Sequence, residues 1–485
     1  MTLQHESLFI GGEWHRPAGP TTISVTSPST EEIIGVVPEA IPSDVDEAVA
    51  AARAAFDDPA GWAHWEPSRR ADALDRLAEA LESRGEQMAQ LVSSQNGMPI
   101  AVSQQLEAVF PTVLLRYYAS MVRDRAPEEQ RQGLMGGKIL VRHEPIGVVA
   151  AIVPWNYPQT LAAFKYAPAL AAGCTVVLKP SPETVLDSFL FAEAVAEAGL
   201  PAGVVNIVPG GREVGAYLVT HPSIDKVAFT GSTEAGRQIG EACGRLLRPV
   251  TLELGGKSAA IVLDDAQLDL ATIGQKLFGA TLMNNGQTCY LCTRILAPKS
   301  RYAEIVDTFS DFAKSLKVGD PLSPETLIGP MVSEKHRDRV EGYIAKGIGD
   351  GAKVTVGGGR PADLDKGWYV EPTIFSDVDN DSAIAQEEIF GPVLSLIPYN
   401  DVDDAVRLAN GSAYGLGGSI WTSDPDRAVE VARRIQTGTI GINDYLPDPA
   451  APFGGVKGSG LGRELGPEGL AAYEQTKSVY LDSTS

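Results

Sequence analysis

Cysteine is scarce in this chain, with four residues among 485. So few cysteines cannot build a disulfide framework in a protein of this length, which favours a reducing compartment. Cys289 and Cys292 form a C-x-x-C pair, but no second pair of cysteines or histidines lies near them in the sequence to complete a zinc site. We therefore expect no metal.

Positive charge is also in short supply, because 40 Lys and Arg stand against 62 Asp and Glu, for a formal net charge of -22. Such an acidic protein is poorly suited to nucleic acid or to an anionic membrane. No run of about 18 apolar residues is present, and the first residues lack the pattern of a signal peptide. We expect a cytoplasmic protein with no nucleic-acid or membrane partner.

The length exceeds what one hydrophobic core supports, so two or three domains are expected. From Val148 onward, apolar strands alternate with helical stretches, a pattern typical of a parallel, doubly wound sheet. The expected strands are 148–153, 175–179, 204–208, 226–230 and 250–254. A second strand–helix series follows Gly255. In such sheets, ligands bind beyond the carboxyl ends of the strands.

Other segments are expected to serve packing. Residues 8–14 predict two short strands around a Gly-Gly turn, and residues 74–91 predict one amphipathic helix. Residues 123–136 are polar and predict a loop that leads into a strand at 138–143. The end of the chain, 477–481, also predicts a strand, and residues 450–462 predict a long loop.

The stretch from Asn284 to Cys289 follows an apolar run, which the Asn-Gly pair interrupts. Cys289 is thereby placed on a turn at the end of a rigid element, where a substrate can reach it. A thiol acts as a nucleophile only as the thiolate, so such a site needs a lowered pKa or a nearby base. The alternative is a small buried hydrophobe, the usual state of a free cysteine.

Three strand ends carry further polar residues. The segment from Thr230 to Gly236 opens a helix and suits a phosphate, although a plain turn explains it equally well. Glu253, followed by two glycines, suits a general base, with a surface acid as the alternative. No histidine lies in an obvious catalytic motif. Asn156 suits an oxyanion donor, with a turn-forming residue as the alternative.

Seven short motifs follow one another along the chain. They are Pro154-Trp155-Asn156, Lys179-Pro180-Ser181, Gly231-Ser232-Thr233-Glu234-Ala235-Gly236, Glu253-Leu254-Gly255-Gly256-Lys257, Gly286-Gln287-Thr288-Cys289, Glu387-Glu388-Ile389-Phe390-Gly391-Pro392 and Pro452-Phe453-Gly454-Gly455. This is the order seen in aldehyde dehydrogenases, and the chain resembles that family over nearly its whole length.

The resemblance implies an α/β fold with doubly wound, parallel Rossmann-type sheets in two domains and a small β arm. It places an NAD(P)-binding domain at 1–122 and 146–253, a catalytic domain at 254–450, and an oligomerisation arm at 123–145 and 470–485. Such an arm builds homodimers or homotetramers.

The resemblance also implies a mechanism. Cys289 attacks an aldehyde, Asn156 and the Cys289 N–H hold the oxyanion, a nicotinamide cofactor takes the hydride from the thiohemiacetal, and Glu253 activates water to hydrolyse the thioester. Lys179 is assigned both to the catalytic residues and to the cofactor-binding residues. The implied cofactor residues are Ile152, Trp155, Lys179, Ser181, Gly211, Gly231, Ser232, Gly236, Leu254, Glu388 and Phe390, with His336 as a further match.

Positions that match the family's substrate tunnel are apolar or aromatic, which predicts uncharged aliphatic or aromatic aldehydes. They are Tyr157, Leu161, Phe164, Met283, Tyr290, Tyr445, Leu446 and Phe453. One departure concerns the cofactor: where NAD-binding relatives often carry glutamate, three residues after Lys179, this chain has Pro182. We expect NAD to be preferred, with NADP also used.

Two competing functions remain open at this point. A CoA-acylating semialdehyde dehydrogenase shares the fold but lacks the general-base glutamate, so Glu253 argues against it. A non-catalytic protein of this fold would be free to lose Cys289, Glu253 or Asn156, and all three are present.

Overall fold

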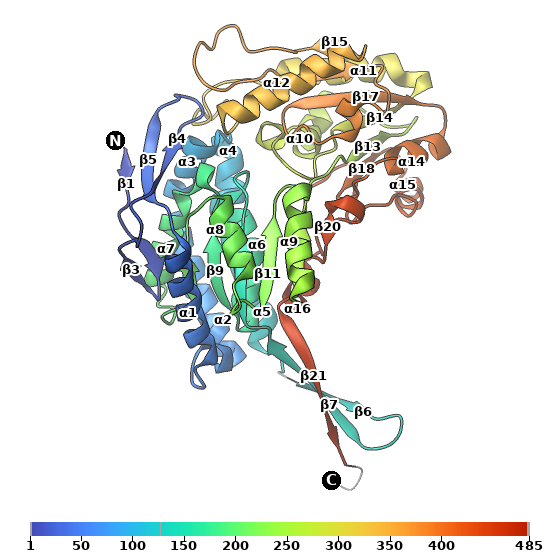
Figure 1. The fold of residues 1–485 in the computed structure, drawn as a ribbon. Helices are drawn as coiled ribbons and strands as arrows, with labels where there is room; N and C mark the ends of the chain where they lie inside the picture. Colours follow the sequence, from blue (N-terminus) through green and yellow to red (C-terminus); the bar gives the residue numbers. More distant parts are fainter. Residues whose placement is uncertain (1, 127, 483–485) are drawn as a thin grey trace.

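The computed structural model describes residues 2–126 and 128–482. Two large sheets, each covered by helices on both faces, form two lobes, and a narrow arm projects from the first (Figure 1). A three-stranded sheet of β1 (Leu3–Gln4), β5 (Ile33–Pro38) and β4 (Thr22–Thr26) lies beside the first lobe. The expected α/β class with two doubly wound sheets and an arm is confirmed.

The first sheet has eight strands, of which the five central ones run parallel. Their order is β20 (Gly460–Leu461), β12 (Val250–Glu253), β11 (Lys226–Thr230), β8 (Val148–Ile152), β9 (Thr175–Lys179), β10 (Val205–Ile207), β2 (Leu8–Ile10) and β3 (Glu13–His15). All the expected strands are therefore present. β20 joins the sheet from within the segment that was expected to be a loop.

Alternate residues of the central strands face opposite helical layers, as the period of two in a strand requires. Val148 and Ala150 face one layer, whereas Val149 and Ala151 face the other. The first layer holds α1 (Pro42–Asp57), α8 (Arg212–Thr220) and α9 (Thr233–Arg245). The second holds α2 (Pro67–Glu82), α5 (Phe110–Arg123), α6 (Pro158–Ala172) and α7 (Asp187–Glu197).

The single helix expected over 74–91 is wrong, because the chain forms α2 and then α3 (Gly85–Asn96). Arg84 leaves the helical conformation and Gly85 starts the new helix, since glycine interrupts a helix at little steric cost. α4 (Ile100–Ser103) and a π-helical stretch at Gln104–Val109 then lead into α5.

The second sheet has seven strands, parallel except at the β15 edge. Their order is β15 (Lys353–Val356), β16 (Thr373–Ser376), β17 (Val393–Tyr399), β14 (Arg294–Pro298), β13 (Ala259–Val262), β18 (Gly418–Trp421) and β19 (Gly441–Ile442). One face is covered by α10 (Leu270–Thr281) and α11 (Tyr302–Ser315). The other is covered by α12 (Glu334–Gly349), α13 (Ala383–Gln386), α14 (Val402–Asn410) and α15 (Pro425–Ala432).

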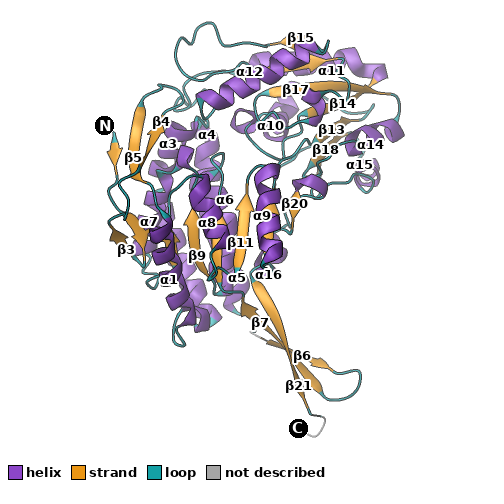
Figure 2. Ribbon diagram, viewed as in Figure 1, coloured by secondary structure: helices purple, strands orange, loops and turns teal. Residues whose placement is uncertain are grey.

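The arm consists of strands and loops (Figure 2). β7 (Lys138–Pro145) pairs with β21 (Glu474–Leu481), which follows α16 (Gly466–Ala471), and with β6 (Glu128–Gln132). The strands expected at 138–143 and 477–481 are confirmed. The loop expected over 123–136 is wrong in part, because ladder hydrogen bonds to β7 make the polar segment 128–132 a strand without burying it.

Candidate active site

Cys289 follows a turn in which three consecutive residues have a left-handed backbone. The φ angles are 50° at Asn284, 62° at Asn285 and 75° at Gly286. A β-carbon at Gly286 would collide with the Gly391 carbonyl, so glycine is required there. The predicted break of the apolar run at Asn-Gly is confirmed, since α10 ends at Thr281, before this turn.

Buried side-chain hydrogen bonds hold this turn. Asn285 accepts from the Gly329 N–H at 2.6 Å and donates to the carbonyls of Gly97 and Pro330 at 2.9 and 3.0 Å. Asn284 donates to the Asn156 carbonyl at 2.9 Å. Non-glycine residues with a left-handed backbone cost free energy. The surrounding hydrogen bonds offset this cost and stabilise the turn. Cys289 is thereby presented on a rigid loop.

Two cavities meet at Cys289 and Asn156. A cleft of about 250 Å³ runs from them to the carboxyl ends of β11 and β12. A narrower cavity of about 50 Å³ runs away among apolar side chains. Cys292 is fully buried and lies 3.4 Å from the Ser419 hydroxyl, measured from sulfur to oxygen. Of the two cysteines in the pair, Cys289 is the one that faces both cavities.

Burial raises the pKa of the Cys289 thiol, and the carboxylates of Glu388 and Glu253 raise it further. The backbone N–H groups of Cys289 and Tyr290 act in the opposite direction, because they point at the sulfur and stabilise the thiolate. Among the described residues, nothing else accepts a hydrogen bond from the Cys289 N–H. This donor is therefore available to an oxyanion.

Asn156 is buried and its amide is oriented by the loop beside it. Its Nδ2 donates to the Gln287 carbonyl at 3.0 Å. A side-chain amide carries two N–H donors, so the second remains for another acceptor. The Asn156 amide and the Cys289 N–H are thus two donors at the junction of the cavities.

Glu253 lies at the end of β12 and lines neither cavity. Both of its carboxylate oxygens are buried, and neither has a hydrogen-bond partner among the described residues. Burial and the neighbouring Glu464 raise the pKa of Glu253 well above its usual value, against the opposing charges of Lys165 and Arg463. The carboxylate must therefore turn to reach the thiol side of the site.

A buried ion pair beside Glu253, formed by Lys165 and Glu464, was not predicted from the sequence. The Lys165 ammonium donates to Glu464 at 2.8 Å and to the Thr230 hydroxyl at 2.6 Å. Lys165 lies on α6, whose 15 residues are all buried. A lone lysine in such an apolar helix could have predicted a buried ion pair, because buried cations need a partner.

The cleft contains six of the predicted cofactor residues. They are Trp155, Gly231, Ser232, Leu254, Glu388 and Phe390. Ser232 caps α9 and accepts from the Ala235 N–H at 3.3 Å, as the strand–turn–helix pattern predicts. The first N–H groups of α9 have no partner within the helix and suit a phosphate. His336, the further match, also lines the cleft, together with Arg339, which was not predicted.

Glu388 and His336 carry the acceptors of the cleft. Burial raises the pKa of Glu388 to about 7, and this carboxylate accepts from the Gly256 N–H at 3.0 Å. Burial lowers the pKa of His336 to about 4. Its Nε2 lies 2.6 Å from the Phe390 carbonyl, which can only accept. Nε2 therefore carries the proton, and Nδ1 is an acceptor.

The other predicted cofactor residues do not line this cleft. Lys179 ends β9 and donates to the carbonyls of Pro180 and Gly210 at 2.7 and 2.5 Å. Its ammonium is therefore held by backbone carbonyls, and both roles assigned to Lys179, catalytic and cofactor-binding, stay predictions. Ile152 pairs with Lys179 across the sheet. Ser181 and Gly211 lie near Lys179, and Gly236 packs against Leu254.

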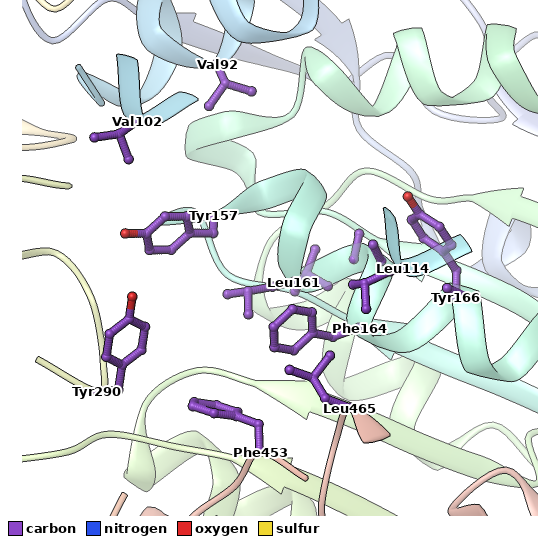
Figure 3. Packing of buried hydrophobic residues seen from close by; sticks show 14 of the residues in the cluster. Val92, Val102, Leu114, Tyr157, Leu161, Phe164, Tyr166, Tyr290, Phe453 and Leu465 are labelled. Carbon is purple, nitrogen blue, oxygen red and sulfur yellow. The ribbon is translucent and has the colours of Figure 1, made fainter. Parts of the chain in front are cut away.

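The second cavity is apolar throughout, and Figure 3 shows its aromatic side chains around a common space. Six predicted substrate residues line it: Tyr157, Leu161, Phe164, Tyr290, Leu446 and Phe453. Met283 and Tyr445 do not, although the Tyr445 ring packs at 5.2 Å, centroid to centroid, against Tyr290. Leu106 of the π-helical stretch and Phe110, the first residue of α5, also line the cavity and were not predicted.

Comparisons with known proteins agree with this geometry. The profile of the aldehyde dehydrogenase family matches residues 14–479. Geranial dehydrogenase from Castellaniella defragrans is 57% identical over 481 residues, which cover 99% of this chain and 100% of that protein. Phenylacetaldehyde dehydrogenase from Pseudomonas fluorescens is 40% identical, with coverage of 99% and 96%.

Solved structures agree as well. A Mycobacterium tuberculosis aldehyde dehydrogenase complexed with NAD+ superposes with a TM-score of 0.97 at 48% identity, covering 100% of both chains. A Cys→Ala mutant of a Pseudomonas syringae aldehyde dehydrogenase, in complex with NAD+ and octanal, gives a TM-score of 0.94 at 40% identity, covering 98% and 96%. The match spans the sheets, the arm and the junction of the cavities, and the chain belongs to the aldehyde dehydrogenase family.

Proposed function

We propose that this protein oxidises uncharged aliphatic or aromatic aldehydes to carboxylic acids with NAD, through Cys289 as the nucleophile. One observation carries the proposal: a wider cleft that holds charged and polar side chains and a narrower apolar cavity meet at Cys289 and Asn156. This junction lets an apolar aldehyde reach the thiol from one side while the cofactor approaches from the other.

The residues of the cleft fit NAD by the chemistry of their donors and acceptors. The N-terminus of α9 and Ser232 suit the pyrophosphate. Glu388 and Nδ1 of His336 are acceptors for ribose hydroxyls, and Trp155 is an apolar wall. The cofactor supplies the two-electron acceptor for the oxidation.

The protein's own groups carry the remaining steps. The Cys289 thiol releases its proton to solvent, and the thiolate attacks the aldehyde carbon. The oxyanion that forms is held by the second Asn156 N–H and the Cys289 N–H. Oxidation leaves a thioester on the Cys289 sulfur. Glu253 turns from its position beside Gly454 and takes a proton from a water molecule, which hydrolyses the thioester. Its raised pKa makes this carboxylate a stronger base than an exposed glutamate.

The substrate class follows from the second cavity, whose lining has no charged side chain. A substrate carboxylate would be buried there without a partner, at a cost of about 2 kcal/mol or more. The relatives named for geranial and phenylacetaldehyde, and the complex with octanal, concern uncharged aldehydes.

The experiment is an assay of NADH formation with hexanal, benzaldehyde and succinic semialdehyde, each with and without CoA. We expect kcat/KM to be roughly 10²-fold lower for succinic semialdehyde, because its carboxylate loses hydration. A higher value for succinic semialdehyde would contradict the substrate class. A requirement for CoA would favour the acylating function instead, and no turnover of any aldehyde would favour a non-catalytic protein.

We further propose a cytoplasmic homo-oligomer built through the arm. All four cysteines are unpaired, which suits a reducing compartment. β6 and β21 are the edges of the arm sheet and present unpaired backbone groups. No helix among residues 2–126 and 128–482 has the length and apolar character to span a membrane. Light scattering should give at least twice the chain mass of 51.4 kDa.

A further inference from the structure

The family resemblance places the adenine ribose of the cofactor at Lys179, and Pro182, three residues further on, has no carboxylate to repel the 2′-phosphate of NADP. The structure brings two other carboxylates to the same place. Glu183 follows Pro182 in a 3₁₀ turn, and Glu39 directly follows β5. Their neighbour is the ammonium of Lys179, whose pKa each of them raises.

Each carboxylate accepts a hydrogen bond from a residue near Lys179. Ser181 donates its hydroxyl proton to Glu183 at 2.5 Å. The Gly211 N–H donates to Glu39 at 3.2 Å. Gly211 is the N-cap residue of α8, so Glu39 already places an anion at that helix start. A phosphate approaching this end of the site meets both charges.

Lys179 cannot compensate for them. Two of its three N–H donors are used on the carbonyls of Pro180 and Gly210. Burial is the largest influence on its pKa, which falls to about 8. One cation with one free donor can serve a neutral ribose hydroxyl, but it is outnumbered by Glu39 and Glu183 when a phosphate must be balanced.

We infer that Glu39 and Glu183 together exclude the 2′-phosphate and set a preference for NAD over NADP, in place of the acidic residue that Pro182 displaces. This inference rests on the proposed function. Arg212, the first residue of α8, is exposed and forms no ion pair with the described residues. It is the cation that would receive the 2′-phosphate once the carboxylates are neutralised.

The test measures equilibrium binding by titration calorimetry, with NAD against NADP and with 5′-AMP against 2′,5′-ADP. The second pair differs only in the 2′-phosphate. The variants are Glu39→Gln, Glu183→Gln and the double variant. Glutamine keeps an acceptor oxygen for Gly211 or Ser181 while it removes the charge. Glu430→Gln on α15 is the matched control, because it removes one exposed charge from the other lobe.

In the wild type, we expect 5′-AMP to bind more tightly than 2′,5′-ADP. The ratio of the dissociation constant of 2′,5′-ADP to that of 5′-AMP should fall about tenfold in each single variant and about 100-fold in the double variant. The reason is that removal of one like charge near a phosphate is worth roughly 1.4 kcal/mol. Adding Arg212→Ala to the double variant should weaken the binding of 2′,5′-ADP again. Glu430→Gln should leave the ratio unchanged.

Two outcomes separate this inference from the proposed function. If the wild type binds NAD but the double variant keeps the wild-type ratio, or if the wild type prefers NADP, the two carboxylates do not set the choice. If the wild type binds no dinucleotide, the proposed function itself fails. Glu183 is exposed, so its variant tests the inference even if Glu39→Gln does not fold.

Discussion

The cleft and the apolar cavity share Cys289 and Asn156 but are built in different ways. The cleft is formed at strand ends and helix starts, where backbone groups and a few polar side chains line the space together with Trp155, Leu254 and Phe390. The apolar cavity is lined by side chains from α6, from the segment around Phe110 and from the loop around Phe453. Backbone geometry thus shapes the side that suits a cofactor, whereas side-chain identity shapes the side that suits an aldehyde.

This difference has a consequence for variation. Substitutions in the cleft must preserve the turns at which β11 and β12 end, so few residues are tolerated. Apart from those at Cys289 and Asn156, substitutions in the apolar cavity change only its volume and polarity, so the substrate can change while the chemistry stays.

The largest effect is expected for Cys289→Ala. Loss of the nucleophile should lower kcat by roughly 10⁴-fold or more, because no covalent route remains. NAD binding should survive, since the cleft keeps its other residues. Cys292→Ala is the control, and it should retain most of the activity. Turnover that survives Cys289→Ala but is lost in Cys292→Ala would mean that the other cysteine is the nucleophile.

Glu253→Gln should separate the two halves of the reaction. Acylation and NADH formation should still occur once per site, but hydrolysis should slow by about 10²–10³-fold because the water loses its general base. Stopped-flow absorbance should show a burst followed by a slow steady state. Equal loss of the burst and of the steady state would assign Glu253 to an earlier step.

Glu388→Gln should make Cys289 more reactive. The pKa of Cys289 is raised by burial and by the Glu388 carboxylate, so the thiol is protonated at neutral pH and alkylation should speed up as pH rises. Removal of the Glu388 charge should lower the pKa of the Cys289 thiol and increase the rate of iodoacetamide alkylation roughly tenfold near pH 8. The exposed neighbour variant Glu387→Gln should change the rate little. An unchanged rate in Glu388→Gln would show that this carboxylate does not act on the thiol.

The smallest effect is expected behind the apolar cavity, at the buried carboxyl of Glu107. Burial raises its pKa well above the usual value, and Asp187 adds to this. A raised pKa stabilises the fold below the unfolded-state pKa, and this contribution is lost as pH rises. Glu107→Gln, which still accepts from the Gln159 N–H, should therefore gain stability relative to wild type, by about 1 kcal/mol near pH 8 and less near pH 5.5.

Thermal unfolding at the two pH values measures this change. Glu79→Gln on α2 is the control, because that carboxylate is exposed and should show no such dependence. A Glu107→Gln variant that is less stable at both pH values would show that the ionised carboxylate is satisfied in the fold.

The sequence by itself determined the local features. The strands from β8 to β12 follow from continuous apolar runs, the turn before Cys289 follows from Asn-Gly, and Ser232 follows from its place between a strand and a helix. These features depend on near neighbours in the chain, which a pattern can show. The seven ordered motifs added the family and the expected roles.

Only the tertiary structure decided which residues that lie far apart in the sequence contact one another. Lys165 and Glu464 pair although 299 residues separate them, and Glu39 reaches Gly211 across 172 residues. The strand at 128–132 forms because β7 offers it ladder hydrogen bonds, whereas its own polar residues predict a loop. The two cavities likewise exist only because loops from both lobes close on Cys289. Such contacts depend on packing in three dimensions, for which local residue preferences carry no signal.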